Sequence, residues 1–276
     1  MNEIVRIAAL MAGIPKEVPA TTVNRQCSSG LQAVANVASA IKSGFYDIGI
    51  AGGVELMSQN PMGSWEGKMN EKIFEDELAK ACLTSMGVTS DNVAERYKVD
   101  RKKQDEVSAL SHKRAAEAQK SGKFKEEIVP VTVTVDDKQV TVTEDEGIRA
   151  DTTVEGLSKL RPVFNPNGTT TAGNASQISD GAAVVVLARR SYAKKHNLPI
   201  LGSLVSFAVV GVEPDVMGIG PAVAIPAALK KAGLQVKDID LFEINEAFAS
   251  QYLYSVQTLG IPIEKVNVNG GAIALG

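Results

Sequence analysis

A long helical segment with almost no charge follows Cys27. Residues 28–43 carry no charged side chain before Lys42, and the segment stops at Gly44, a residue type at which helices commonly end. Its clearly polar residues form one narrow stripe: Gln32, Asn36, Ser39 and Lys42. A helix this apolar needs protein on nearly all of its circumference. The segment therefore predicts a layered fold in which other elements cover it on more than one side.

Cys27 lies where an extended segment meets the start of this helix. Residues 19–23 are β-prone, and the sequence Ser28-Ser29-Gly30 leaves room around the sulfur. Unpaired N–H groups and the positive end of the helix dipole favour a thiolate here, and the thiolate is the attacking species. The alternative is that Cys27 is buried as a small hydrophobic residue. A cysteine that only packs in a core, however, does not require a turn containing glycine beside it. We therefore expect Cys27 to be a nucleophile.

The composition is that of a folded protein without nucleic-acid or membrane-spanning features. Of 276 residues, 44% are hydrophobic and 22% are charged, which excludes disorder as the main state. The formal net charge is −3 and no basic stripe carries interleaved aromatic residues, so nucleic acid is not an expected partner. The longest apolar run, around residues 182–188, is too short to span a bilayer. Cys27 and Cys82 form no paired framework, which indicates a reducing compartment, and no residues have metal-ligand spacing.

The first two regions of the chain differ in secondary-structure pattern and polarity. Residues 1–58 alternate helix and strand, with an alanine-rich helix at the start and a strand at 46–51. Residues 59–176 are more polar and irregular. Amphipathic helices rich in charge are expected within 92–120, on a solvated face, and strict alternation within 131–143 predicts an exposed hairpin around the turn Asp136-Asp137-Lys138-Gln139.

The α/β alternation returns from about residue 177. Continuous apolar runs predict buried strands at 182–187 and 201–210. Residues 221–231 then form a helix pattern, and residues 240–244 a further strand. These patterns predict an α/β protein with a more polar insertion in the middle of the chain.

Asn245 and Glu246 follow the last of these predicted strands. Polar groups at the carboxyl ends of strands in α/β sheets face the crevice in which ligands bind. Capping of the next helix by Asn245 fits the same position equally well, so both interpretations stay open. His112, by contrast, is followed by Lys113 and Arg114 and is expected on an exposed helix surface.

A series of motifs, in the same order along nearly the whole chain, resembles those of thiolases. They are Asn24–Ala33, Gly52–Glu55, Met86–Thr89, Gly173–Ser176, Met217–Pro221, Asn245–Ala249 and Asn269–Gly271. In detail, Arg25–Ser29 and the block Asp238–Ser250 are most similar to the peroxisomal 3-ketoacyl-CoA thiolases of eukaryotes.

The resemblance implies a thiolase fold, in which two similar α/β halves stack into five layers (αβαβα) and a loop domain is inserted in the first half. On this interpretation residues 1–58 and 177–196 form the N-terminal half, residues 59–176 the loop domain and residues 197–276 the C-terminal half. Both halves are expected to be incomplete here.

The resemblance also implies a chemistry: thiolytic cleavage of 3-ketoacyl-CoA to acetyl-CoA and a shortened acyl-CoA, in fatty-acid β-oxidation. Cys27 would carry the acyl group, and Asn245 would hold a water at an oxyanion position. The residues implied to contact the substrate are Arg149, Ala172, Gly173 and Ser176 along the CoA, and Met86, Met217 and Phe248 near the thioester. CoA is a substrate in this family, and the resemblance implies no cofactor or metal.

The family pattern continues beyond both ends of this sequence. The resemblance places the first residue inside the helix that precedes the nucleophile strand, and it places a catalytic histidine directly after Gly276 and a second catalytic cysteine later. His196 and Cys82 match neither position. We therefore expect unpaired sheet edges and, at most, a slow first half-reaction without sustained turnover.

Several hypotheses follow for the activity. The chain is an incompletely represented thiolase, or a truncated and catalytically poor product that binds CoA or pairs with an intact subunit. A thiol redox protein with Cys27 as the sensor is a third possibility, against which the CoA-contacting motifs argue. The resemblance implies a peroxisomal protein that is a homodimer or tetramer when complete, although no targeting signal is visible in the sequence.

Overall fold

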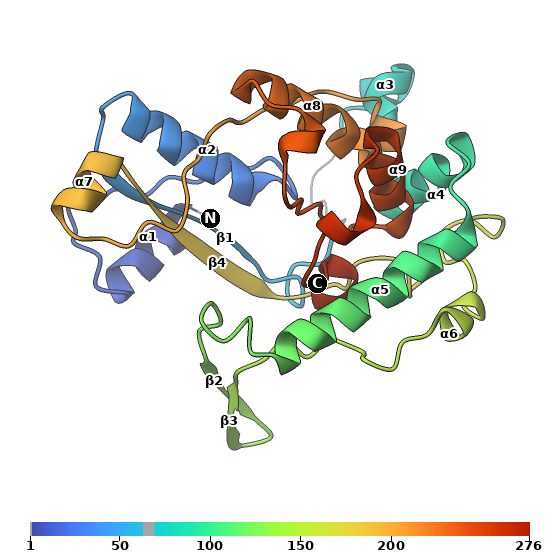
Figure 1. Cartoon of the computed structure of the whole chain (residues 1–276), viewed down its shortest axis with the longest axis horizontal. Helices are drawn as coiled ribbons and strands as arrows, with labels where there is room; N and C mark the ends of the chain where they lie inside the picture. The colour runs from blue at the N-terminus through green and yellow to red at the C-terminus, as the bar shows by residue number, and fades with distance from the viewer. Residues whose placement is uncertain (1, 63–68) are drawn as a thin grey trace. The chain divides into compact units, whose positions relative to one another are not determined.

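The computed structural model describes residues 2–62 and 69–276 (Figure 1). The chain forms two compact units. Unit 1 comprises Met1–Ser64 and Ser179–Val205, and unit 2 comprises Trp65–Ile178 and Ser206–Gly276. The expected division into two incomplete halves and an inserted loop domain stays a prediction.

Unit 1 is built on a two-stranded antiparallel sheet. Ile48 lies opposite Ala188 and Glu55 lies opposite Gly181, without a bulge between them. The described elements of this unit are α1 (Asn2–Met11), α2 (Ser29–Lys42), β1 (Ile48–Glu55), β4 (Gly181–Ala188) and α7 (Arg190–Lys195). The predicted first helix, long helix and strand at 46–51 are thus confirmed.

One face of this sheet lies against α2. Small residues alternate along β1 on that face, and a methyl group added to Gly49 would lie 2.8 Å from Val37 Cγ1 of the helix. Ala51, two residues further along the same face, is buried. Close approach of helix and strand therefore depends on the absence of larger side chains in β1.

The opposite face of the sheet is open. Val184 and Val186 are 72% and 63% exposed, and their cross-strand partners are Gly52 and Ile50. The strand predicted at 182–187 is confirmed as β4, but its predicted burial is wrong. The expectation that protein covers nearly all of α2 is also wrong, because the sheet covers one side and only Ala35 and Ile41 are buried.

Two further predicted strands do not form. Residues 19–23 have no hydrogen-bonded strand beside them among the described residues, and residues 201–210 are irregular. A β-prone sequence becomes a strand only when a neighbouring strand accepts and donates its backbone hydrogen bonds. Neither segment has that neighbour in the described ranges.

Unit 2 is mainly helical, with a small hairpin. Its described elements are η1 (Glu71–Glu75), α3 (Glu77–Ala81), α4 (Met86–Arg96), α5 (Arg101–Lys120), β2 (Val131–Val135), β3 (Lys138–Val142), α6 (Val154–Ser158), η2 (Pro214–Ile219), α8 (Gly220–Ala232), η3 (Val236–Asp238), α9 (Ala249–Leu259), η4 (Ile263–Lys265) and α10 (Ala272–Leu275). The helix predicted at 221–231 is confirmed as α8, which ends at Gly233 with a φ of +71°.

The apolar core of unit 2 lies where α9 packs against α4 and α5 (Figure 1). Tyr252, Leu253 and Val256 of α9 meet Phe242 and Val266, which are joined by a single parallel bridge. The strand predicted at 240–244 is therefore reduced to this bridge. The other buried members of the core cluster are Ala94, Val99, Ile244 and Ile261.

The long helix α5 buries a polar face. Asp100 caps its start by accepting a 3.1 Å hydrogen bond from Lys103 N. The buried residues are small or hydrogen-bonded: Gln104, Asp105, Ser108, Ser111, His112, Ala115 and Ala118. The predicted helices in this region are confirmed, but the expectation of a solvated face is wrong on this side of α5. His112 is likewise buried rather than exposed.

The hairpin of β2 and β3 is confirmed, with a tighter turn than predicted. Val135 pairs directly with Lys138, so the loop is the two residues Asp136 and Asp137. Both have positive φ, +48° and +59°, which matches a turn with the twist of the flanking strands. In the described ranges, no helix is long and apolar enough to cross a membrane.

Candidate functional site

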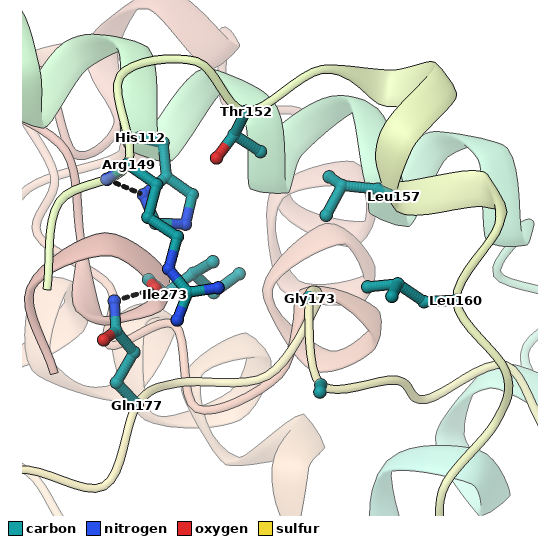
Figure 2. Close-up of a pocket in the computed structure, with 9 residues that line it drawn as sticks. His112, Arg149, Thr152, Leu157, Leu160, Gly173, Gln177 and Ile273 are labelled. Carbon is teal, nitrogen blue, oxygen red and sulfur yellow. Dashed lines mark hydrogen bonds between the residues drawn. The ribbon is translucent and has the colours of Figure 1, made fainter.

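A pocket of about 160 Å³ lies within unit 2, next to the buried face of α5 (Figure 2). Apolar side chains form one side, and a histidine, an arginine and a glutamine form the other. The lining residues are His112, Arg149, Thr152, Leu157, Leu160, Ala172, Gly173, Gln177 and Ile273. The structure thus brings together Arg149, Ala172 and Gly173, which the sequence assigned to CoA.

The apolar side of the pocket depends on a glycine. Leu157, in α6, and Leu160, just after it, lie next to Gly173 on the side of the pocket away from Arg149 (Figure 2). A methyl group added to Gly173 would overlap both leucine side chains. Any larger residue at this position therefore displaces the leucines or fills the pocket.

Two side chains hold the segment that carries Arg149. The ring atom His112 Nδ1 accepts a 3.1 Å hydrogen bond from the backbone N–H of Arg149. Gln177 Nε2 donates to the carbonyl oxygens of Gly147 at 2.7 Å and Ala274 at 2.8 Å, which joins the same segment to α10. The backbone from Gly147 to Arg149 is thereby held, while the Arg149 side chain reaches into the pocket (Figure 2).

The electrostatics of the pocket suit an anion. Burial lowers the pKa of His112, the neighbouring Arg149 guanidinium lowers it further, and Asp151 opposes both effects. The imidazole is therefore neutral near pH 7. Across the described residues, the Arg149 guanidinium makes no ion pair with a carboxylate. A guanidinium without a protein partner is well matched to the oxygens of a phosphate group.

Glu246 lies in a separate polar cluster in the same unit. Its carboxylate accepts hydrogen bonds from Ser111 Oγ at 2.6 Å, Asn267 Nδ2 at 2.9 Å and Ile273 N at 3.2 Å. The side chain is buried, and burial raises the pKa of Glu246 while these donors oppose the rise. Glu246 thus ties α5, the turn before α10 and α10 itself to the segment that carries Asn245.

Asn245 is exposed. The residue that caps α9 is Phe248, three positions later, so the interpretation of Asn245 as a helix cap is wrong. The same segment lies beside the residues before β4, because Ser176 N donates to Ala247 O at 2.9 Å and Phe248 forms a bridge with Ala175. The predicted substrate residues Ser176 and Phe248 are therefore on neighbouring backbone segments.

The two predicted methionines lie on elements that pack together. Met86 is the first residue of α4 and is half-buried, and Met217 lies in η2 and is more exposed. The elements α4, η2 and α9 contact one another pairwise. A methyl group added to Gly218 would lie 2.7 Å from Gln251 Cβ of α9, so η2 sits close to that helix.

Cys27 lies in unit 1 and is exposed. Its position, two residues before the first residue of α2, is the predicted one, and the alternative of a buried packing cysteine is wrong. Side chains order this loop: Arg25 N donates to Ser29 Oγ at 2.8 Å, and Ser29 Oγ donates to Gln26 O at 2.6 Å. Gln26 adopts a φ of +48°, so the turn before Cys27 is tight.

Sequence reasoning missed part of the pocket. Thr152, Leu157, Leu160, Gln177, Ile273 and His112 were not assigned to it. For His112 a signal existed in the spacing of Gln104, Ser108, Ser111 and Ala115, which places small and uncharged polar residues on one helical face. Within the described residues, no group of three or more histidine, cysteine, aspartate or glutamate side chains is arranged to hold a metal ion.

Comparison with known protein families defines the class. The model of the thiolase N-terminal domain matches residues 1–191, and that of the thiolase C-terminal domain matches residues 198–276. The chain therefore belongs to the thiolase family, as its motifs indicated.

Individual relatives indicate which type of thiolase the chain is similar to. The chain is 62% identical over 276 residues to the mouse protein 3-ketoacyl-CoA thiolase A, peroxisomal, covering 98% of this chain and 65% of the relative. The human peroxisomal 3-ketoacyl-CoA thiolase is 59% identical, with the same coverage. The chain thus spans about 65% of the length of these relatives.

Solved structures confirm the thiolase fold. The crystal structure of the dimeric peroxisomal thiolase of Saccharomyces cerevisiae is 50% identical in sequence and matches with a TM-score of 0.93, covering 98% of this chain and 69% of that one. Human mitochondrial 3-ketoacyl-CoA thiolase is 41% identical and matches with a TM-score of 0.89, covering 98% and 71%.

Proposed function

We propose that this chain acts in the thiolytic cleavage of 3-ketoacyl-CoA to acetyl-CoA and a shortened acyl-CoA, as an acetyl-CoA C-acyltransferase of fatty-acid β-oxidation. The observation that carries the proposal is the pocket of unit 2. There Arg149, which makes no ion pair among the described residues, lines the same pocket as Ala172 and Gly173, and the resemblance to thiolases assigns all three to CoA.

Cys27 is the acyl acceptor in this proposal. Its thiolate attacks the C3 carbonyl carbon of the 3-ketoacyl-CoA, and a tetrahedral intermediate forms. The C2–C3 bond then breaks, its electron pair leaves with the acetyl-CoA carbanion, and a proton completes acetyl-CoA. The acyl group remains on Cys27 as a thioester. The thiol of a second CoA loses its proton to solvent and attacks this thioester. The bond between the acyl carbon and Cys27 Sγ then breaks, which regenerates the Cys27 thiolate and releases the shortened acyl-CoA.

The remaining predicted residues bind and orient the substrate. Arg149 pairs with a phosphate of the CoA, and Ala172, Gly173 and Ser176 lie along its pantetheine arm. An arm that is long and weakly polar suits a pocket with apolar walls and few polar groups. Near the thioester, Asn245 holds a water that donates to the oxyanion. Met86, Met217 and Phe248 line the acyl end.

Location and assembly follow from the relatives. The mouse and human proteins are named as peroxisomal, and the Saccharomyces cerevisiae structure is described as dimeric. We propose that this chain acts in the peroxisome and assembles as a homodimer or tetramer, and that CoA is a substrate rather than a bound cofactor.

A second candidate function is favoured by the open face of the sheet in unit 1. In this function the chain binds CoA but turns over poorly, and it pairs with an intact thiolase subunit. Ile50, Val54, Val184 and Val186 share this face and are all exposed. A contiguous apolar face of this kind is commonly covered by another polypeptide.

The test is acylation in the absence of free CoA. The chain is incubated with acetoacetyl-CoA or a longer 3-ketoacyl-CoA, and the modified peptide is located by mass spectrometry. We expect one acyl group on Cys27, unchanged in Cys82→Ser and absent in Cys27→Ser. Acylation of Cys82, or a Cys27→Ser variant that still becomes acylated, would contradict the proposal.

Adding free CoA separates the two candidate functions. Repeated release of acetyl-CoA favours the first, in which the chain completes the cycle. A single acylation without turnover favours the second. In that case turnover should begin only when an intact thiolase subunit is added.

A further inference from the structure

We propose that His112 is a positioning residue for the nucleotide part of CoA, and that the pocket holds Arg149 in place only while the His112 ring is neutral. This inference rests on the proposed function, in which the pocket takes CoA. It concerns a side chain that no step of the proposed reaction uses.

The first observation is the direction of one hydrogen bond. His112 Nδ1 accepts from the backbone N–H of Arg149 at 3.1 Å, so Nδ1 carries no proton and the ring proton is on Nε2. In Figure 2 this second nitrogen points into the pocket, toward the side chain of Arg149. The imidazole therefore accepts a hydrogen bond from the Arg149 backbone through Nδ1 and presents the Nε2–H donor to the pocket.

The second observation is the set of charges around the ring. From the facing segment, the Arg149 guanidinium and the Asp151 carboxylate act on His112 in opposite directions. On α5 itself, Lys113 is exposed and Arg114 donates to Val266 O at 2.7 Å and Ile263 O at 3.1 Å, in another part of the unit. The other pocket-lining residues carry no charge: Thr152, Leu157, Leu160, Ala172, Gly173, Gln177 and Ile273.

Burial and Arg149 together outweigh Asp151, so the pKa of His112 lies below its ordinary value of about 6.5. The ring is neutral at pH 7.5 and takes up a proton only in acid. The unfolded chain takes up that proton at a higher pH than the folded chain. His112 therefore lowers the stability of the fold as pH falls below about 6.5.

Protonation removes the acceptor. Nδ1–H then faces the Arg149 N–H, and a second cation lies next to the guanidinium, so the ring and the Arg149 segment repel each other. The hydrogen bonds from Gln177 to Gly147 O and from Thr152 N to Arg149 O remain. The backbone of Arg149 is then held by one hydrogen bond fewer, and the resulting loss of positioning outweighs the added positive charge. CoA binding should weaken in acid.

The experiment compares CoA affinity between pH 7.5 and pH 5.5, by isothermal titration calorimetry on the 276-residue chain and two variants. In His112→Gln the amide oxygen still accepts from Arg149 N–H but does not titrate. In His112→Ala the acceptor is lost. At pH 7.5 we expect the glutamine to restore much of the affinity that the alanine removes. On acidification, the wild type should lose several-fold more affinity than His112→Gln.

Two controls make the comparison specific. The phosphates of CoA also titrate, but equally in every variant, so only the difference between pH profiles counts. Calorimetry in buffers of different ionisation enthalpy should show that the wild type releases more protons on binding near pH 6 than His112→Gln does. Parallel pH profiles, or a wild type whose binding tightens relative to His112→Gln in acid, would overturn the inference.

A measurement without ligand decides the inference even if the proposed function fails. Hydrogen exchange at the Arg149 amide, corrected for the intrinsic effect of pH, should lose protection between pH 7.5 and 5.5 in the wild type and keep it in His112→Gln. Unchanged protection in the wild type would refute the role of His112. Failure of the wild type to bind CoA at pH 7.5 would instead refute the proposed function.

Discussion

The two units of the chain differ in the side chains that they bury. In the described part of unit 1, the buried apolar side chains are Ala35, Ile41, Ala51 and Ala193, of which three are alanines. Unit 2 buries a cluster of large apolar residues around α9. A strand or helix thus forms from its local sequence, whereas its burial depends on a covering layer that the local sequence does not supply.

Unit 2 also buries polar side chains, and most of their polar atoms have partners. Asp105, for example, accepts from Arg101 Nε at 2.9 Å, and Glu246 accepts from three donors on other segments. Such groups are costly to bury alone and specific in their geometry when paired. The stability of unit 2 should therefore depend on single polar residues as strongly as on its apolar core.

The largest effect should come from Glu246→Ala. The change leaves Ser111 Oγ, Asn267 Nδ2 and Ile273 N buried without their acceptor. We expect the free energy of unfolding to fall by about 3 kcal/mol, measured by urea denaturation followed by circular dichroism. The control is Glu243→Ala, an exposed carboxylate three residues earlier, which should change stability by less than about 0.5 kcal/mol. Equal effects would show that the cluster is not a source of stability.

A matched pair of valines compares the two units directly. Val93 in α4 is fully buried in unit 2, and Val184 in β4 is 72% exposed in unit 1. Val93→Ala should lower the free energy of unfolding by about 2 kcal/mol, because it removes two buried methyl groups and leaves a cavity. Val184→Ala should cost less than about 0.5 kcal/mol. A large cost at Val184 would show that its face is covered in solution.

The smallest effect concerns the two exposed thiols. Cys27 precedes α2, whereas Cys82 follows α3 and its Sγ donates to Leu78 O at 3.5 Å. Because the Cys82 thiol is engaged in this hydrogen bond, alkylation near neutral pH should label Cys27 a few-fold faster. Mass-mapped labelling with iodoacetamide measures both rates in one sample. Faster labelling of Cys82 in the folded chain would undermine the nucleophile assignment.

The sequence predicted the elements that form from neighbouring residues, but not the contacts between segments that are distant in the chain. The helices α2 and α8 and the hairpin follow from charge, periodicity and turn residues, all within a few positions. The strands predicted at 19–23 and 201–210 failed because a strand also needs a partner. The resemblance to thiolases assigned Arg149, Ala172 and Gly173 to CoA, and the structure places all three around one pocket, which periodicity alone could not predict.

The buried polar residues of unit 2 were the hardest feature to predict from the sequence. Polar residues on α5 were expected at the surface, yet Ser111 and His112 are buried because their partners come from elsewhere. Ser111 bonds to Glu246, which is 135 residues away in sequence, and His112 bonds to Arg149, which is 37 residues away. No pattern within a single helix encodes such pairs.

Hydrogen exchange with and without CoA tests most directly the proposal that the pocket of unit 2 binds CoA. Without ligand, amides of α4, α5 and α9 should exchange slowly and those of β1 and β4 quickly. Addition of CoA should slow exchange in residues 147–153 and 171–177 and leave α1 unchanged. Slowing confined to unit 1, or none at residues 147–153 under saturating CoA, would contradict the account.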